Sequence, residues 1–139
     1  MSIANWEGIA LIIGTGDIGI NLADYLKNCS PKLDVILCGR NLNSKKDIYL
    51  DLENDDSFKS FEKDLSSFKK PIRLVINTSG FLHSNLIKPE KRLSHINRSS
   101  IIKNFSVNAI APILIAKSIE PFIKVKLPFS YSSLSARVG

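Results

Sequence analysis

The chain has 139 residues, 44% of them hydrophobic and 23% charged, a composition that excludes a disordered or fibrous protein. Its length fits a single domain, residues 1–139, with one hydrophobic core. The net charge of +6 is spread along the chain, with only short pairs such as Lys45-Lys46 and Lys69-Lys70, so we expect a solvated basic surface and no nucleic-acid partner.

Cysteine usage and the absence of long apolar runs indicate the compartment. Cys29 and Cys38 lack the spacing of a metal site, so we expect two free thiols in a reducing environment. The N-terminus has no basic leader, and no apolar run approaches the roughly 18 residues of a membrane span. We therefore expect a cytoplasmic protein with no membrane segment.

The stretch that organises the chain is a glycine turn at residues 14–19, GTGDIG. An apolar run at residues 9–13 predicts a strand before it, and apolar residues spaced three to four apart predict a helix after it. We expect Gly14 to allow a sharp turn, Gly16 to let a ligand approach the backbone, and Gly19 to let the helix pack on the strand. Strand, turn and helix predict a pyrophosphate-binding dinucleotide turn, against the alternative of a purely structural tight connection. The turn also contains Thr15, Asp17 and Ile18.

Residues 33–38 predict a second, parallel strand, and the residue that selects the cofactor usually follows this strand. Arg40 stands there, whereas Asp34 lies too far back along the strand to reach a ribose 2′-hydroxyl. A guanidinium can pair with a 2′-phosphate, which favours NADP over NAD. The alternative is that Arg40 is an ordinary surface charge.

The seven residues 41–47 are too few and too polar for a crossover helix, and residues 48–52 predict a third strand. Asp51 near its end, beside Leu52, either accepts a hydrogen bond from an adenine amino group or caps the strand end. Residues 55–68 predict a helix that covers the sheet. Its core-facing residues are Phe58, Phe61, Leu65 and Phe68.

Residues 72–77 predict a fourth strand that ends in Asn77, Thr78, Ser79 and Gly80. Gly80 permits close approach of a ligand, and the Asn77 amide can tie neighbouring strand ends together. The polar loop at residues 81–97 contains His83 and His95, which lack partners at ligand spacing, so we expect no metal.

Residues 99–117 predict a long helix that contains Asn108 and, four residues later, Pro112. Because proline has no N–H, we expect a kink and a free Asn108 carbonyl. This arrangement favours a bound water or a proton relay, against a merely tolerated kink. Residues 128–134 predict a fifth strand, which leads to Ser135.

These elements predict an α/β, Rossmann-like fold with a parallel sheet of about five strands in the order 3-2-1-4-5. Several motifs, in this order along the chain, resemble the short-chain dehydrogenases/reductases, most closely their C-factor-like branch. Besides the glycine turn they are NTSG at 77–80, KPEKRL at 88–93, FSVNAIAP at 105–112 and SSLSARVG at 132–139. The resemblance covers essentially the whole chain but only the N-terminal part of such a protein, so it implies that the family's C-terminal strands are lacking.

The resemblance implies NADP-dependent hydride transfer to or from a small carbonyl or alcohol substrate. For the cofactor, it implies that Gly14, Gly16 and Gly19 hold the phosphates, that Arg40 contacts the ribose phosphate and that Asp51 contacts adenine. Asn77 and Gly80 would line the ribose. For the substrate, it implies that Asn108 holds the relay water and that Ser135 hydrogen-bonds the substrate oxygen, with Ser133 as the alternative. It further implies a homo-oligomer formed through the Asn108 helix.

Two departures from the family pattern matter. The glycine turn is one residue shorter than the family's usual form. The family's acid/base is a tyrosine followed four residues later by a lysine, but the residues four after Tyr25, Tyr49 and Tyr131 are cysteine, glutamate and serine. We therefore expect an N-terminal fragment that binds cofactor but lacks the acid/base. The alternative function is a non-catalytic nucleotide-sensing Rossmann module.

Overall fold

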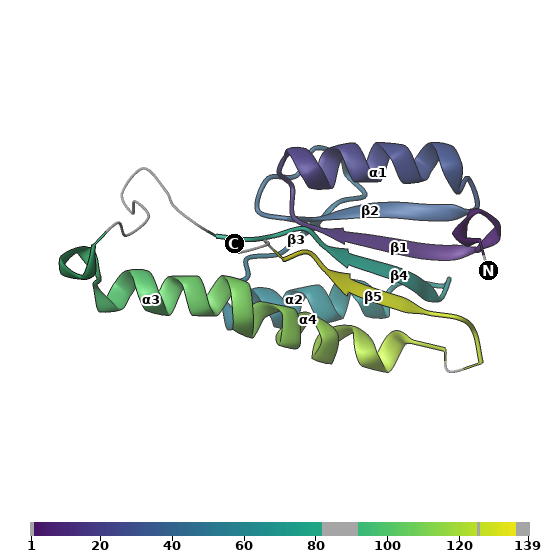
Figure 1. Ribbon diagram of the computed structural model, residues 1–139. Helices are drawn as coiled ribbons and strands as arrows, with labels where there is room; N and C mark the ends of the chain where they lie inside the picture. The colour runs from purple at the N-terminus through teal and green to yellow at the C-terminus, as the bar shows by residue number, and fades with distance from the viewer. Residues whose placement is uncertain (1, 82–91, 125, 136–139) are drawn as a thin grey trace.

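Helices separate the strands along the chain except between β2 and β3, and the strands form one five-stranded sheet in the order β3-β2-β1-β4-β5 with every pair parallel (Figure 1). The computed structural model describes residues 2–81, 92–124 and 126–135. The strands are β1 (Gly8–Ile13), β2 (Leu33–Gly39), β3 (Ile48–Tyr49), β4 (Ile72–Asn77) and β5 (Ser130–Ser133). The predicted Rossmann-like α/β fold and its strand order are confirmed.

Helices cover both faces of the sheet (Figure 1). One face carries α1 (Asp17–Cys29), and the other carries α2 (Asp55–Ser66) and the α4 part of a long helical run whose α3 part extends beyond the end of the sheet. That run consists of α3 (Arg98–Phe105), a π-helical segment η3 (Ser106–Ile110) and α4 (Ala111–Ile119). Three short 3-10 turns are η1 (Ile3–Asn5), η2 (Leu93–His95) and η4 (Glu120–Phe122).

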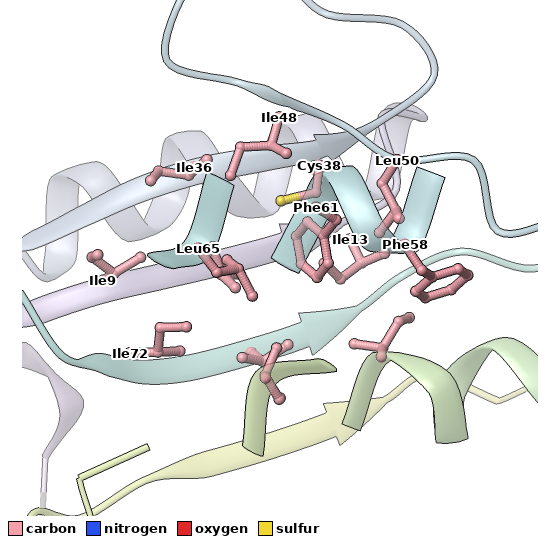
Figure 2. Packing of buried hydrophobic residues seen from close by; sticks show 14 residues of the cluster. Ile9, Ile13, Ile36, Cys38, Ile48, Leu50, Phe58, Phe61, Leu65 and Ile72 are labelled. Atoms are coloured by element: carbon pink, nitrogen blue, oxygen red, sulfur yellow. The ribbon is translucent and has the colours of Figure 1, made fainter. Parts of the chain in front are cut away.

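The core lies on both sides of β1, whose six residues are all buried. On the α2 and α4 face, Phe61 and Leu65 of α2 pack against the strands (Figure 2), and Ile115 of α4 belongs to the same cluster. As predicted, Phe58 is buried with them, while Phe68 is only partly buried at the edge of this cluster. A second cluster fills the space under α1 and contains Ala10, Ile12, Ala23, Leu26, Leu33, Leu37, Leu74 and Trp6.

The third strand is shorter than predicted, because β3 ends at Tyr49 rather than at residue 52. The backbone is drawn toward the start of α2 instead: the Asp51 N–H donates to Ser57 Oγ at 2.8 Å, and Asn54 caps the helix. The Leu50 N–H still donates to Gly39 O at 3.1 Å, whereas the next N–H, of Asp51, faces away from β2 and bonds to the helix.

The long helix bearing Asn108 and Pro112 changes its winding there. The Ala111 N–H donates to Ser106 O, five residues back, which is the π-helical pattern. One extra residue in this turn accommodates Pro112, which cannot donate and would otherwise crowd the preceding turn.

The same helical run corrects the expectation that no stretch is long and apolar enough to cross a membrane. Among the described residues, Arg98–Phe122 passes that test by length and composition. This is weak evidence for a span, because Val107, Ala111, Ile115 and Ile119 are buried on the inner side of the run.

Candidate functional site

A cavity of about 290 Å³ opens at the carboxyl ends of β1, β2 and β4, where an open α/β sheet binds its ligand. Most of the predicted cofactor residues line it: Gly14, Thr15, Gly16, Arg40, Asp51, Leu52, Thr78, Ser79 and Gly80. The tertiary structure adds Glu53, Phe81 and Val107, which no sequence signal singled out. The remaining predicted residues do not line it: Asp17, Ile18, Gly19 and Asn77.

The glycine turn is built as its spacing predicts. Gly14 has a φ of +112°, a conformation that favours glycine, and its N–H donates to Cys38 O at 2.8 Å. A Cβ at Gly19 would overlap the carbonyl oxygen of Gly14, so α1 can start this close to the turn only because residue 19 is glycine. Gly16 differs, because a Cβ there would meet nothing within 4 Å. The protein itself therefore leaves open space next to Gly16.

The start of α1 provides backbone donors beside that space. Gly16 is the N-cap residue, with φ −83° and ψ 179°, and no side chain caps the helix. The first N–H groups of a helix have no intrahelical acceptor, and together with the helix dipole they favour an anion.

Thr78 supports the turn from behind. Its N–H and its hydroxyl both donate to Ile13 O, at 2.8 and 3.0 Å. The hydroxyl oxygen would lie 2.6 Å from a Cβ on Gly14, so Thr78 and the glycine turn are closely packed. The loop after β4 therefore fixes the position of the loop after β1.

Arg40 and Asp51 lie at the far end of the cavity from β4. Arg40 is exposed directly after β2. Asp51 is half-buried, and its Oδ1 accepts the Glu53 N–H at 3.1 Å, the kind of bond that the strand-end alternative anticipated. The contact of Asp51 with adenine stays a prediction.

Asn77 is fully buried and joins the ends of β4 and β5, as predicted for its amide. Its Nδ2 donates to Ser133 Oγ at 3.0 Å, and its Oδ1 accepts from the Ser79 N–H at 3.1 Å and from the Ser79 hydroxyl. The Leu134 N–H in turn donates to Asn77 O at 2.8 Å. Ser133 is thus engaged in holding the strand ends.

A second cavity, of about 650 Å³, adjoins the first and shares Ser79, Gly80 and Phe81 with it. Its walls include Asn108 and Ser135, the two residues predicted to be catalytic. The two cavities form one cleft that runs from the glycine turn to the end of β5.

The Asn108 side chain clamps the backbone that crosses this cleft. Its Nδ2 donates to Phe81 O at 2.7 Å, and its Oδ1 accepts the Phe81 N–H at 2.8 Å. The Lys103 ammonium lies 4.8 Å from the centre of the Phe81 ring and 3.6 Å from Glu53 Oε2. Sequence reasoning missed these contacts. The predicted relay water at Asn108 stays a prediction.

None of the tyrosines lines either cavity within the described residues. Tyr25 and Tyr49 are exposed, and the Tyr131 hydroxyl donates to Pro112 O at 2.7 Å. Burial raises the pKa of Tyr131, which is opposite to what an acid/base near neutral pH requires.

In the part of the chain that the structure describes, no group of three His, Cys, Asp or Glu is placed to hold a metal ion. His95 is exposed in η2, and His83 lies outside the described residues.

No family model matches this sequence, and no curated protein matches it. Its structure is nevertheless similar to many solved structures, most of those compared being named dehydrogenases or reductases. An aldohexose dehydrogenase from Thermoplasma acidophilum is 16% identical with a TM-score of 0.75, covering 94% of this chain and 49% of the enzyme. A short-chain dehydrogenase/reductase from Saccharomyces cerevisiae is 16% identical with a TM-score of 0.76, covering 93% and 53%.

A protein named ribose-5-phosphate isomerase, from Brucella melitensis, is 15% identical with a TM-score of 0.77, covering 95% of this chain and 53% of that one. At such identities the likeness shows the fold alone. The chain spans about half the length of these three proteins. Its fold is similar to that of short-chain dehydrogenases/reductases over about half of their length.

Proposed function

We propose that the chain is the cofactor-binding part of an NADP-dependent oxidoreductase of the short-chain dehydrogenase/reductase type, of the C-factor-like branch that its motifs resemble. The observation that carries this proposal is the continuous cleft from the glycine turn, past Gly80, to Ser135. NADPH would supply the hydride. The chain's own residues would bind the cofactor and orient a carbonyl or alcohol substrate.

The phosphates would lie on the glycine turn, residues 14–19, against the uncapped start of α1. The space beside Gly16 and the lack of a side-chain cap support this placement. The ribose side would lie against the 77–80 segment, and adenine would lie toward Asp51 and Leu52. Ser135 would bond the reacting oxygen of the substrate in the second cavity.

Arg40 would select NADP by pairing with the 2′-phosphate. A charge-assisted hydrogen bond contributes about 1.5–3 kcal/mol, roughly ten- to a hundred-fold in affinity. We expect Arg40→Ala to weaken NADPH binding by this factor in a fluorescence titration and to leave NADH binding unchanged. Arg98→Ala is the control, because Arg98 starts α3 and does not line either cavity. An unchanged preference in Arg40→Ala would remove Arg40 from the site.

The 139-residue chain itself is expected to bind cofactor without turnover. General acid/base catalysis contributes about 10²–10⁴ in rate, and none of the three tyrosines is followed four residues later by lysine. The assay is NADPH oxidation with a panel of aldehydes and ketones at high protein concentration. Turnover by the purified chain would mean that another residue donates the proton.

A second candidate function is a nucleotide-sensing module that binds without chemistry. The observation that favours it is that Tyr131, which lines neither cavity, has its hydroxyl engaged with the Pro112 carbonyl. The affinity for a ketone, measured with and without NADP, separates the two candidates. An oxidoreductase site would bind the ketone more tightly with NADP present, and Ser135→Ala would abolish that gain in affinity. A pure sensor would show no such coupling.

We also propose that the protein is cytoplasmic and self-associates through the Asn108 helix. The outer side of this helix exposes large apolar residues, namely Ile102, Phe105 and Ile113. Sedimentation of the wild type and of Phe105→Glu would test the association, which the added charge should abolish.

A further inference from the structure

The outer edge of β2 is open over most of its length. β3 pairs with β2 only at Cys38 and Gly39, while β1 pairs with residues 33–38 of β2 on the other side. Within the described part of the chain, residues 33–37 therefore have no strand on their outer side.

The hydrogen bonds at the end of β2 show which backbone groups face that edge. The Cys38 carbonyl accepts from Gly14 on the β1 side, and the Gly39 carbonyl accepts from Leu50 on the β3 side. Because successive residues of a parallel strand direct their N–H and C=O groups to opposite sides, Val35 and Leu37 direct theirs to the outer edge. This is the pattern that a further strand recognises.

A groove of about 1020 Å³ runs along this edge, between β2, the 44–48 segment and the end of α2. Val35, Ile36 and Phe68 provide apolar surface in it. It shares no residue with the two cavities of the candidate cofactor site.

The rim of the groove is basic. Its cations are Lys27, Lys45, Lys46, Lys69 and Lys70, against three aspartates, Asp34, Asp47 and Asp64. Two of these acids are already engaged: Asp34 pairs with Lys70 at 2.7 Å, and Asp47 accepts two backbone N–H groups of its own loop. None of the ion pairs found among the described residues involves Lys45, Lys46 or Lys69. The net charge of the groove rim is therefore positive.

We propose that the β2 edge binds an extended acidic segment of a partner protein as an added strand. The segment's backbone pairs with Val35 and Leu37, and its carboxylates face the lysines. A second copy of this chain is a poorer occupant, because edge-to-edge pairing would bring two lysine-rich rims together.

The test uses the whole chain and a fluorescein-labelled peptide of about eight residues that alternates valine and glutamate, long enough to cover the free edge. We expect saturable binding by anisotropy that weakens at least tenfold in the double variant Lys45→Glu, Lys46→Glu. A peptide that alternates valine and lysine should not bind. Equal binding of both peptides would overturn the proposal.

Backbone pairing is tested separately from charge. Val35→Pro removes an N–H that faces outward and leaves the β1 ladder intact, so it should abolish binding, while Val35→Thr keeps the N–H and should bind normally. The same acidic peptide, N-methylated at alternate amides, should lose binding in one methylation register and keep it in the other. This arm decides the matter if Val35→Pro fails to fold, and binding in both registers would overturn strand addition.

The remaining explanation is that the lysines only keep the edge unpaired. In that case Lys45→Ala, Lys46→Ala would self-associate in sedimentation and the wild type would bind no acidic peptide, a result that overturns the proposal.

Discussion

Two glycines of the turn should respond in opposite ways to the same change, alanine, because the protein surrounds one of them and leaves the other open. A Cβ on Gly19 would overlap the Gly14 carbonyl, a backbone atom that cannot move without shifting β1 or α1. Overpacking costs about 1–3 kcal/mol and more where backbone must move, so we expect Gly19→Ala to lose about 3 kcal/mol. At about 4 °C per kcal/mol for a chain of this size, Tm should fall by about 12 °C.

Gly16→Ala should leave stability nearly unchanged. Its φ of −83° and ψ of 179° suit alanine, and no atom lies within 4 Å of the new Cβ. Alanine is a poorer N-cap than glycine by about 1 kcal/mol, and the stiffer unfolded chain offsets this by about 0.4–1 kcal/mol. The net change is therefore below about 1 kcal/mol.

The same Cβ would stand where the phosphates are proposed to lie. We expect Gly16→Ala to weaken NADPH at least tenfold, about 1.4 kcal/mol, with thermal unfolding and fluorescence titration measured on the same samples. A Gly16→Ala protein that folds normally and binds NADPH as well as the wild type would refute the placement of the phosphates on this turn. A Gly19→Ala protein of unchanged Tm would refute the packing argument.

Three further outcomes follow from individual contacts. Asn108→Ala removes both bonds to the Phe81 backbone, so NADPH binding should weaken several-fold, with a stability loss of about 1–2 kcal/mol in denaturant unfolding. Asn108→Asp should not recover the affinity, because its second carboxylate oxygen would face the Phe81 carbonyl, and recovery by Asp would contradict the role of the amide donor. Tyr131→Phe should cost about 1 kcal/mol of stability by removing the bond to α4 and leave cofactor affinity unchanged, and a change in affinity would place the phenol in the site. Burial raises the pKa of Cys38, so below pH 9 a thiol reagent should modify the half-buried Cys29 first, and Cys38 should react only at the rate of unfolding. Each thiol can be followed alone in the single variants Cys38→Ser and Cys29→Ser. Equal rates of thiol modification in the two variants would contradict this prediction.

The sequence by itself determined the local elements of this protein and their order. Strand, glycine turn and helix at the start of the chain are encoded in adjacent residues: the positive φ of Gly14 and the close packing of Gly19 are requirements that few other residue types meet. The spacing of Phe58, Phe61 and Leu65 likewise fixes which side of α2 faces the sheet. Helices between most of the strands indicate a parallel sheet, and the order found is the one expected for the Rossmann-like fold that the glycine turn indicates.

Only the tertiary structure decided how the candidate site is held together. Asn108 meets Phe81 across 27 positions, Asn77 meets Ser133 across 56, and Thr78 meets Ile13 across 65. No periodicity reports such pairings, because each depends on where two separate elements come to lie on the same sheet edge. The same holds for the segment after β3, where the Asp51 N–H bonds to Ser57 of the following helix. The open β2 edge is likewise decided by tertiary packing, because β3 pairs with β2 only at Cys38 and Gly39, and residues 50–52 of the predicted strand would lie beyond these positions.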